Sequence, residues 1–177
     1  MGELKGHDGE IHCMAVTPNG LHAMSGSSDM TLKVWDLRMG TCTTTLSGHF
    51  GWVRCMAITP ESRHVVSGSN DMTLKVWDLR TGTCAATLSG HSSQVRGVAI
   101  TPDGRHAVSV SCMDLNVWEL GSGVCTSSIF TCGNHGWFSS SVCVTPDGRR
   151  VLYCGSSRSV VKVASLAEWR EGGRVGM

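Results

Sequence analysis

The stretch GHDGEIHCMAVTPNGLHAMSGSSDMTLKVWDLRMGTCTTTLS, residues 6–47, is followed directly by a second version of itself, GHFGWVRCMAITPESRHVVSGSNDMTLKVWDLRTGTCAATLS, residues 48–89. The two stretches are identical at about two-thirds of their aligned positions. All four prolines lie in matching motifs, TPNG, TPES, TPDG and TPDG, at steps of 42, 42 and 44 residues. The chain is therefore an array of four repeats, predicted at residues 6–47, 48–89, 90–131 and 132–166.

Each repeat is predicted to form four strands. Turns of the TPDG type favour hairpins, because proline sets φ at one corner and glycine accepts a positive φ at another. In the first repeat this turn joins the strand-like residues 11–17 to residues 22–27, and the turn SSDM leads to TLKVWDL at 31–37. A threonine-rich fourth strand follows from residue 41. Four strands in about 42 residues predict an all-β fold and exclude helical repeats and the α/β classes.

Composition and charge exclude several function classes. The chain has 177 residues, 41% of them hydrophobic, and 15 Lys+Arg against 14 Asp+Glu give a net charge of +1. This balance disfavours nucleic-acid binding through an overall positive field. No apolar run approaches the roughly 18 residues of a membrane span, and the N-terminal segment lacks the apolar core of a signal peptide. We expect an intracellular protein without a membrane segment, cytoplasmic in the first instance, with a nuclear location left open.

The nine cysteines are interpreted as reduced thiols. Their number is odd, and the chain has no CxxC motif. Cys42, Cys84 and Cys125 occupy matching places in successive repeats, as do Cys13 and Cys55. Residues placed in this way lie one repeat apart, whereas a disulfide needs Cα atoms within about 7 Å. We expect small, mostly buried hydrophobic side chains, and we predict no metal site and no cofactor.

The two ends of the repeated motif carry a family resemblance. Gly-His is followed 28 residues later by Trp-Asp in both complete repeats, at His7 with Trp35 and at His49 with Trp77. With the TPDG and SxSxD turns in register, the chain resembles the WD-repeat β-propeller family from residue 6 to about residue 166. The resemblance implies four four-stranded antiparallel blades in a partial or open propeller, because closed members usually have more blades. Residues 1–5 are then a stub of an outer strand, and residues 167–177 a C-terminal tail.

The third and fourth repeats depart from the pattern. In the third, the turn SCMD is one residue short, so Asp114 lies four residues before Trp118 instead of six. We expect its polar network to be incomplete. In the fourth repeat, Ala164 and Ser165 stand where Trp-Asp should be, and Arg158 occupies the Asp position. This blade is predicted to be degenerate.

A set of His, Ser, Asp and Trp residues recurs once per repeat. These residue types could also serve a Ser-His-Asp hydrolase, but the chain has no GxSxG elbow, and a hydrolase needs a single exposed nucleophile with an oxyanion hole. In the resembling family the carboxylate orients the His, the His bonds a hydroxyl, and the hydroxyl meets the indole N–H. A structural role is therefore expected, and catalysis is not. The choice of Ser25 over Ser27, and of Ser67 over Ser69, stays open because strand register is not visible. The predicted network comprises His7, Ser25, Asp29, Trp35, His49, Ser67, Asp71, Trp77, His91, Ser109 and Trp118.

Partner binding is predicted on one rim of the blades. In the resembling family, the narrow face around the central channel binds partners through residues that flank the first strand and precede the tight-turn Asp. Carried over by position, these residues are Glu10, His12, Ser28, Trp52, Arg54, Asn70, Gln94 and Arg96. Trp52, Arg54 and Arg96 form the best recognition patch, because Trp and Arg are common interface anchors. Two guanidinium groups favour an acidic or phosphorylated peptide.

The sequence thus predicts a non-catalytic scaffold that presents loop residues to a protein or peptide partner. One alternative is that Trp52 merely covers a neighbouring loop while the arginines are solvated. Another is a partial propeller module that self-associates through its open blade edges, or that belongs to a longer regulatory or signalling WD-repeat protein. Trp137 and Phe138 in the longer fourth loop form a second exposed-aromatic candidate.

Overall fold

The computed structural model describes residues 2–130, 141–154 and 161–167, which form four antiparallel sheets of consecutive strands. Blade one consists of β1 (Ile11–Val16), β2 (His22–Ser27), β3 (Thr31–Asp36) and β4 (Thr41–Ser47). Blade two consists of β5 (Val53–Ile58), β6 (His64–Ser69), β7 (Thr73–Asp78) and β8 (Thr83–Ser89). Blade three consists of β9 (Val95–Ile100), β10 (His106–Ser111), β11 (Asp114–Glu119) and β12 (Val124–Phe130). Blade four has β13 (Val142–Val144), β14 (Arg150–Cys154) and β15 (Val161–Ser165) among the described residues.

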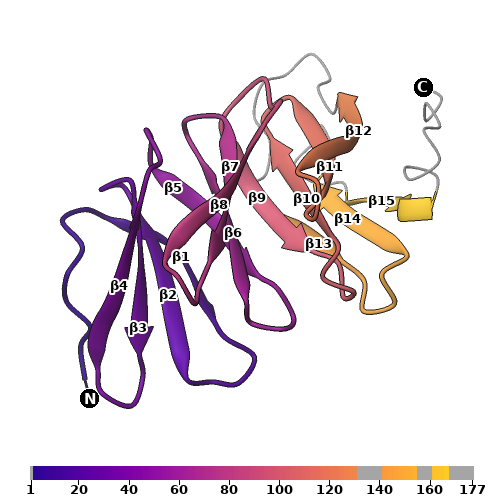
Figure 1. The fold of residues 1–177 in the computed structure, drawn as a ribbon. Coiled ribbons are helices and arrows are strands. Elements are labelled where there is room, and N and C mark those ends of the chain that lie inside the picture. Colours follow the sequence, from indigo (N-terminus) through magenta and orange to yellow (C-terminus); the bar gives the residue numbers. More distant parts are fainter. Residues whose placement is uncertain (1, 131–140, 155–160, 168–177) are drawn as a thin grey trace.

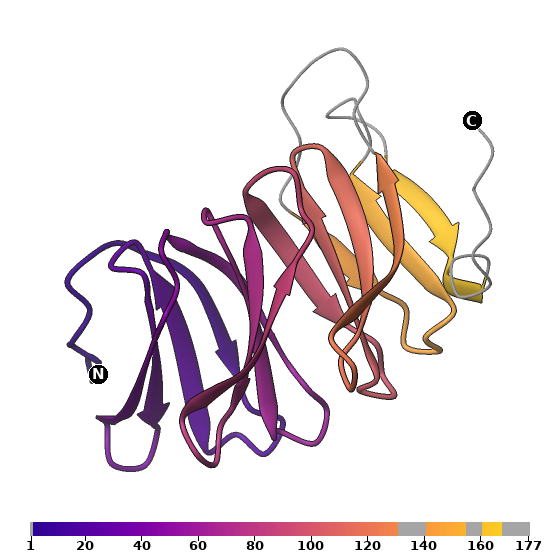
Figure 2. The ribbon, with the colours of Figure 1, turned by 45° about the horizontal axis from the view of Figure 1, so that its top comes forward.

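The four blades stand side by side in chain order. Figure 1 shows the row running from β1–β4 at one end to β13–β15 at the other. The turned view in Figure 2 shows the first and last blades at opposite ends of the row rather than in contact. The first strands β1, β5 and β9 lie next to one another along the inner side of the row. The predicted all-β fold of antiparallel blades in a partial propeller is confirmed.

The TPDG-type turns form the first hairpin of each blade as predicted. In blade one the backbone N–H of Thr17 donates to the carbonyl of His22 over 2.9 Å, which closes the turn. Gly20 and Gly104 at the last corner have φ values of 68° and 69°, in the left-handed region that glycine tolerates. In blade two Ser62 takes the same conformation, with φ of 57°. The turn geometry is therefore kept even where the glycine is missing.

The core lies between the blades rather than inside them. Between blades one and two, Met24 and Leu46 pack against Val53 and Trp77 in one buried cluster. Equivalent clusters join blade two to blade three and blade three to blade four. Each blade thus buries one face against the next blade, as expected for a repeat array.

Within the described residues, no other blade packs on the outward face of blade one. Val53, at the start of β5, is fully buried against blade one. The matching residue on β1, Ile11, is 49% exposed, and Met14 and Val16 farther along β1 are 76% and 57% exposed. The row of blades is therefore open at this end.

The prediction that the cysteines are mostly buried is wrong. Among the described cysteines Cys55 alone is buried, whereas Cys143 and the repeated set Cys42, Cys84 and Cys125 are exposed. The repeated set lies near the start of β4, β8 and β12, which are the outermost strands of their sheets. At this place on the outer strands the side chains are exposed to solvent. Each thiol donates instead to the backbone carbonyl two residues on, over 3.3–3.5 Å.

Blade four keeps the register of the others without their motif residues. Ala164 pairs with Val151 and Ser165 with Arg150 across β14 and β15. In blade one, the residues at these places in β3 are Trp35 and Asp36. The position predicted for the missing Trp-Asp pair therefore agrees with the strand register. Arg158 lies outside the described residues.

Candidate functional site

A chain of side-chain hydrogen bonds in blade one links β2, β3, the turn between them and the segment before β1. The indole Nε1–H of Trp35 donates to Ser25 Oγ over 2.8 Å. The same Oγ lies 2.7 Å from Nε2 of His7, and Nδ1 of His7 lies 2.7 Å from the Asp29 carboxylate. A carboxylate can only accept, so Nδ1–H of His7 donates to Asp29, while Ser25 Oγ accepts the indole proton and bonds Nε2.

Blade two repeats this chain of bonds in a more buried setting. Trp77, Ser67, His49 and Asp71 are joined over 2.8, 2.8 and 2.7 Å. The second serine of the SxS pair, Ser69, makes a different hydrogen bond: its Oγ accepts from the backbone N–H of Asp71 over 3.1 Å. Each serine of the pair therefore satisfies a different donor. The strand register, invisible in the sequence, decides which serine meets the indole.

Blade three contains the same network, so the expectation that it is incomplete is wrong. Trp118 Nε1–H donates to Ser109 Oγ over 2.8 Å, Nε2 of His91 lies 2.6 Å from that Oγ, and Nδ1 of His91 contacts the Asp114 carboxylate. The shortened turn places Asp114 at the first position of β11, which is Thr31 in blade one. Thr31 Oγ1 lies 3.5 Å from Nδ1 of its own blade's His. A carboxylate at this position is therefore within reach of the imidazole.

Burial and hydrogen bonding set the charge states in blade two. Burial raises the pKa of Asp71, but hydrogen bonds from Thr73, the backbone N–H of Phe50 and His49 outweigh it and bring the pKa down to about 2. Burial lowers the pKa of His49, an effect that Asp71 partly opposes. The carboxylate is therefore ionised and the imidazole neutral at physiological pH. The pKa values of Asp29 and Asp114 are likewise lowered, because their hydrogen bonds outweigh burial.

The free energy of unfolding is expected to fall in two steps as the pH is lowered. Below about 6.5, His49 takes up a proton in the unfolded chain but not in the buried network, which favours unfolding. Between about 3.8 and about 2, Asp71 is protonated in the unfolded chain and still ionised in the folded one. Urea unfolding at a series of pH values measures both steps. His49→Gln should reduce the first step, and a stability that rises between pH 7 and 5 would contradict the assignment.

A hollow lies on the inner side of the first three blades. His12, Arg54 and Arg96 occupy the second position of β1, β5 and β9, which lie side by side. They line a hollow of about 360 Å³ together with Cys13, Cys55 and Met56. Two cationic groups and an imidazole thus meet, and none of the lining residues carries a carboxylate. Two buried polar atoms, His12 Nε2 and Arg96 Nε, have no hydrogen-bond partner.

Trp52 lies at the edge of this hollow between two polar side chains. Its ring stacks on His12 of blade one, with centroids 5.5 Å apart and an interplanar angle of 27°. The guanidinium carbon of Arg54 lies 4.6 Å from the Trp52 ring centroid, within cation–π range. Asn70 Oδ1 accepts from Arg54 Nε over 3.0 Å. Trp52 nevertheless remains 44% exposed, so its ring is held in place and still accessible.

The other predicted rim residues are held by local bonds. In blade one the backbone N–H of Glu10 donates to Ser28 Oγ over 2.8 Å, and the backbone N–H of Ser28 donates back to the Glu10 carbonyl over 2.9 Å. In blade three Gln94 Oε1 accepts from Arg96 over 3.4 Å. The structure therefore brings Trp52, Arg54 and Asn70 of blade two into direct contact. In blade three, Gln94 and Arg96 contact each other. Trp137 and Phe138 lie outside the described residues.

Exposed apolar residues of blade two on this rim were missed. Phe50 is 89% exposed and Met72 is 47% exposed. Phe50 occupies the place of Asp8 and Ser92, and all three donate their backbone N–H to the network aspartate of their blade. Comparing this position between repeats would have revealed Phe50, because the shared backbone bond does not require an aromatic side chain.

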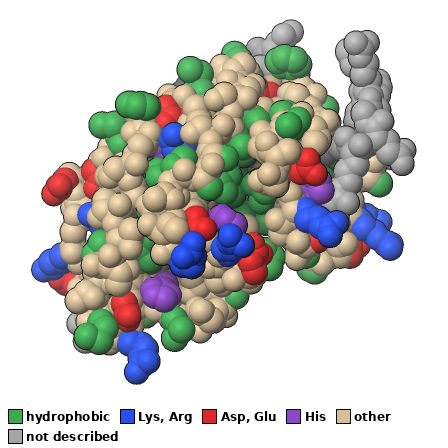
Figure 3. All heavy atoms as spheres, in the orientation of Figure 1, with side chains coloured by type: hydrophobic (Ala, Val, Ile, Leu, Met, Phe, Trp, Pro, Cys, Tyr) green, Lys and Arg blue, Asp and Glu red, His purple; other side chains and the backbone are tan. Residues whose placement is uncertain are grey.

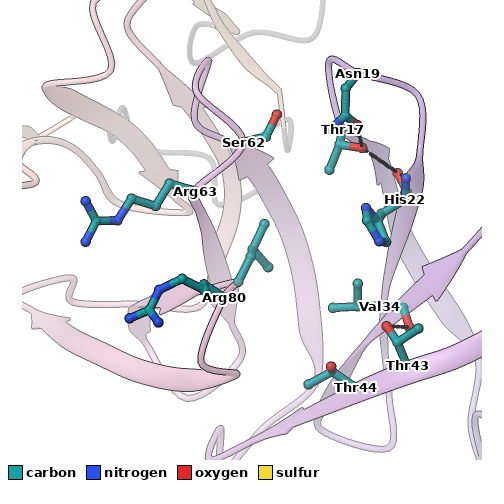
Figure 4. A pocket seen from close by; sticks show the side chains of 10 residues that line it. Thr17, Asn19, His22, Val34, Thr43, Thr44, Ser62, Arg63 and Arg80 are labelled. Carbon is teal, nitrogen blue, oxygen red and sulfur yellow. Dashed lines mark hydrogen bonds between the residues drawn. The ribbon is translucent and has the colours of Figure 1, made fainter.

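A second hollow lies between blades one and two on the opposite rim. It has a volume of about 260 Å³, and Arg63, Arg80 and His22 are among its lining residues. Figure 4 shows the guanidinium groups of Arg63 and Arg80 extending to the same side, away from His22. Thr17 Oγ1, also on the lining, already bonds within its own turn. The two guanidinium groups therefore do not converge with His22 on one point of this hollow.

Charge and metal-binding groups add no further site. Figure 3 shows basic and acidic side chains lying next to one another over the visible face. Within residues 2–130, 141–154 and 161–167, no group of three or more His, Cys, Asp or Glu side chains could hold a metal ion. No helix in the described part of the chain has the length and apolar character needed to cross a membrane.

The chain shares its repeats with known proteins. The family described as "WD domain, G-beta repeat" matches residues 1–36, 40–78 and 82–119, well over half of the chain. Nuclear distribution protein PAC1 of Candida dubliniensis is 49% identical over 37 residues, 21% of this chain and 8% of that protein. WD repeat-containing protein 1 of Mus musculus is 38% identical over 45 residues, 25% of this chain and 7% of that protein. The chain thus spans only a small part of these relatives.

A solved structure supports the fold. The structure of U3-55K superposes with a TM-score of 0.84 at 22% identity, over 93% of this chain and 51% of that one. The chain therefore spans about half the length of that protein, and its four blades are arranged as blades are in the larger structure.

Proposed function

This chain belongs to the WD-domain, G-beta repeat family, and from that premise we propose that it acts as a non-catalytic scaffold whose inner rim binds an acidic peptide segment of a partner protein. Proteins of this family commonly serve as interaction scaffolds. Function then depends on side chains that a rigid framework presents at its loops.

The observation that supports this proposal is the accessible ring of Trp52, held between His12 and Arg54 at the edge of the hollow. An anchor that is already ordered loses little conformational entropy on binding. Arg54 and Arg96 line the same hollow and are not paired with any carboxylate among the described residues. A carboxylate or phosphoryl group of a peptide would provide the missing countercharge.

Differences between the repeats support the same site. Glu10, Trp52 and Gln94 occupy equivalent positions at the edge of the first strand, as do His12, Arg54 and Arg96 one step into it. The blades fold alike in spite of these differences, so the fold does not require a tryptophan or an arginine there. Binding to a partner explains the variation better than packing does.

Selection of a random phage-displayed peptide library on the purified chain tests this function. We expect the enriched peptides to share an acidic residue, and we expect Arg54→Gln/Arg96→Gln to weaken a synthetic enriched peptide about tenfold, measured by fluorescence anisotropy. The matched control is Arg63→Gln/Arg80→Gln on the opposite rim, which should bind as the wild type does. Placing phosphoserine or serine at the acidic position separates a phosphoryl from a carboxylate preference. Equal binding by both double variants, or no enriched peptide, would overturn the proposal.

A further inference from the structure

We propose that Phe50, Trp52 and Met72 form an apolar anchor site on the rim of blade two, which takes an aliphatic or aromatic side chain near the acidic residue of the bound peptide. This inference rests on the proposed function, because it assigns the chemistry of a second part of the same ligand. It concerns the surface beside the hollow rather than the hollow itself.

Among the first three blades, whose rim positions the structure describes, blade two alone has two aromatic residues there. Phe50 stands where blade one has Asp8 and blade three has Ser92. The backbone bond made at this position is the same in all three blades, at 3.0, 3.0 and 2.9 Å. The fold therefore uses only the backbone here, and a phenylalanine that is 89% exposed contributes little to the core. Large exposed apolar side chains that gather at one place mark interaction surfaces.

Met72 is the third residue of the anchor site, and its backbone conformation is unfavourable for methionine. Its φ is 67°, in the left-handed region that favours Gly or Asn over residues with a large side chain. The side chain is 47% exposed. Methionine is flexible and polarisable, and it is common on surfaces that accept varied apolar partners. Met30 has the same conformation in blade one, with φ of 66°, but Asp8 and Glu10 are the rim residues of that blade.

The backbone of Phe50 and Trp52 bonds to the turn that contains Met72. The backbone N–H of Phe50 donates to the carboxylate of Asp71, directly before Met72, over 3.0 Å. The Trp52 carbonyl accepts the backbone N–H of Asn70 over 3.0 Å. Phe50, Trp52 and Met72 are thus tied to neighbouring residues of the same turn. Trp52 also contacts His12 and Arg54, two of the residues that line the hollow, and so connects this turn to the cationic groups.

This position of Trp52 defines the ligand. An extended peptide advances about 3.3 Å per residue, and its successive side chains point to opposite faces. With an acidic side chain in the hollow, the side chain that reaches Phe50 and Met72 is therefore the one two residues away, which points to the same face. The peptide that fits is short, extended and linear, with one acidic and one apolar residue close together.

The test is a double-mutant cycle between the chain and the enriched peptide from the library selection. The chain variant is Phe50→Ser/Met72→Asn, which substitutes serine as at position 92 and a residue that tolerates positive φ. Replacing the peptide's apolar residue by serine should weaken binding to the wild type about tenfold and to the variant less than twofold. The matched control is Met30→Asn, which changes the same turn of blade one and should respond as the wild type does.

The outcomes separate this inference from the proposed function. If the peptide's apolar residue matters equally to the wild type and to Phe50→Ser/Met72→Asn, the anchor site is wrong. If acidic residues are nevertheless required, the cationic hollow stands. If exchanging the acidic residue for its amide changes nothing, the proposed function fails instead. A peptide selection that yields no binder overturns both, provided that urea unfolding shows the chain to be folded.

Discussion

Replacing Gly68 by alanine is expected to lower the free energy of unfolding by about 3 kcal/mol, because the new Cβ has no room. An ideal Cβ at this position would lie 2.6 Å from Cys55 Sγ and 2.6 Å from Val95 Cγ1. Cys55 and Val95 are buried, so neither can move into solvent. The clash therefore strains blade two and its contact with blade three together.

Urea unfolding of Gly68→Ala measures this effect. The control is Gly121→Ala, where an added Cβ meets nothing within 4 Å, so its stability should stay within about 0.5 kcal/mol of the wild type. A variant Gly68→Ala as stable as Gly121→Ala would contradict the expected packing.

Blade three suggests how part of the clash can be relieved. Cys55 pairs with Gly68 across β5 and β6, whereas the equivalent pair across β9 and β10 is Gly97 with Val110. In each blade one residue of this pair is a glycine and the other has a side chain. The side chain belongs to the first strand in blade two and to the second strand in blade three. Cys55→Gly should therefore recover part of the stability lost in Gly68→Ala, while the contact with Val95 remains. Strictly additive losses would show that the two positions are independent.

The fold could be predicted from the sequence because the same turn and strand motifs recur in each repeat. The TPDG turns and the alternating strands predicted the blades, and the register of Ala164 and Ser165 agrees with the predicted alignment of the fourth repeat. The spacing of residues gave a wrong prediction for Asp114, which was expected to lie outside the network of blade three. Spacing along the chain does not reveal that the first position of β11 lies beside the imidazole. The spacing also did not predict that Cys42 is exposed, because it does not say which strand of a blade is outermost.

The candidate site could be predicted only in part, because some of its contacts form between blades. The family's motif pointed to Trp52, Arg54 and Arg96, and the structure brings their three positions to one rim. The stacking of Trp52 on His12 crosses two blades and depends on how they pack, which a single repeat cannot show. Phe50 was overlooked because the comparison was confined to the positions known from the family.

Replacing Ser67 by alanine is the second change with a large expected effect. The Ser67 hydroxyl accepts the indole N–H of Trp77 and lies 2.8 Å from Nε2 of His49. Trp77 is 1% exposed, and the His49 side chain is fully buried. Alanine would leave both groups buried without a partner, and each such group costs about 1–3 kcal/mol. We expect the free energy of unfolding to fall by about 3 kcal/mol, a large share of the stability of an ordinary domain.

Two further variants show whether the lost hydrogen bonds cause this fall. Trp77→Phe removes the indole donor, so Ser67→Ala should cost less in that background than in the wild type, and equal costs would point to packing instead. Ser25→Ala makes the same change in blade one, where the network aspartate is 13% exposed against 9% in blade two and Ile11 on the outer face is 49% exposed. Water can satisfy groups there more easily, so the loss should be smaller. A larger loss for Ser25→Ala would mean that burial between blades does not set the strength of these networks.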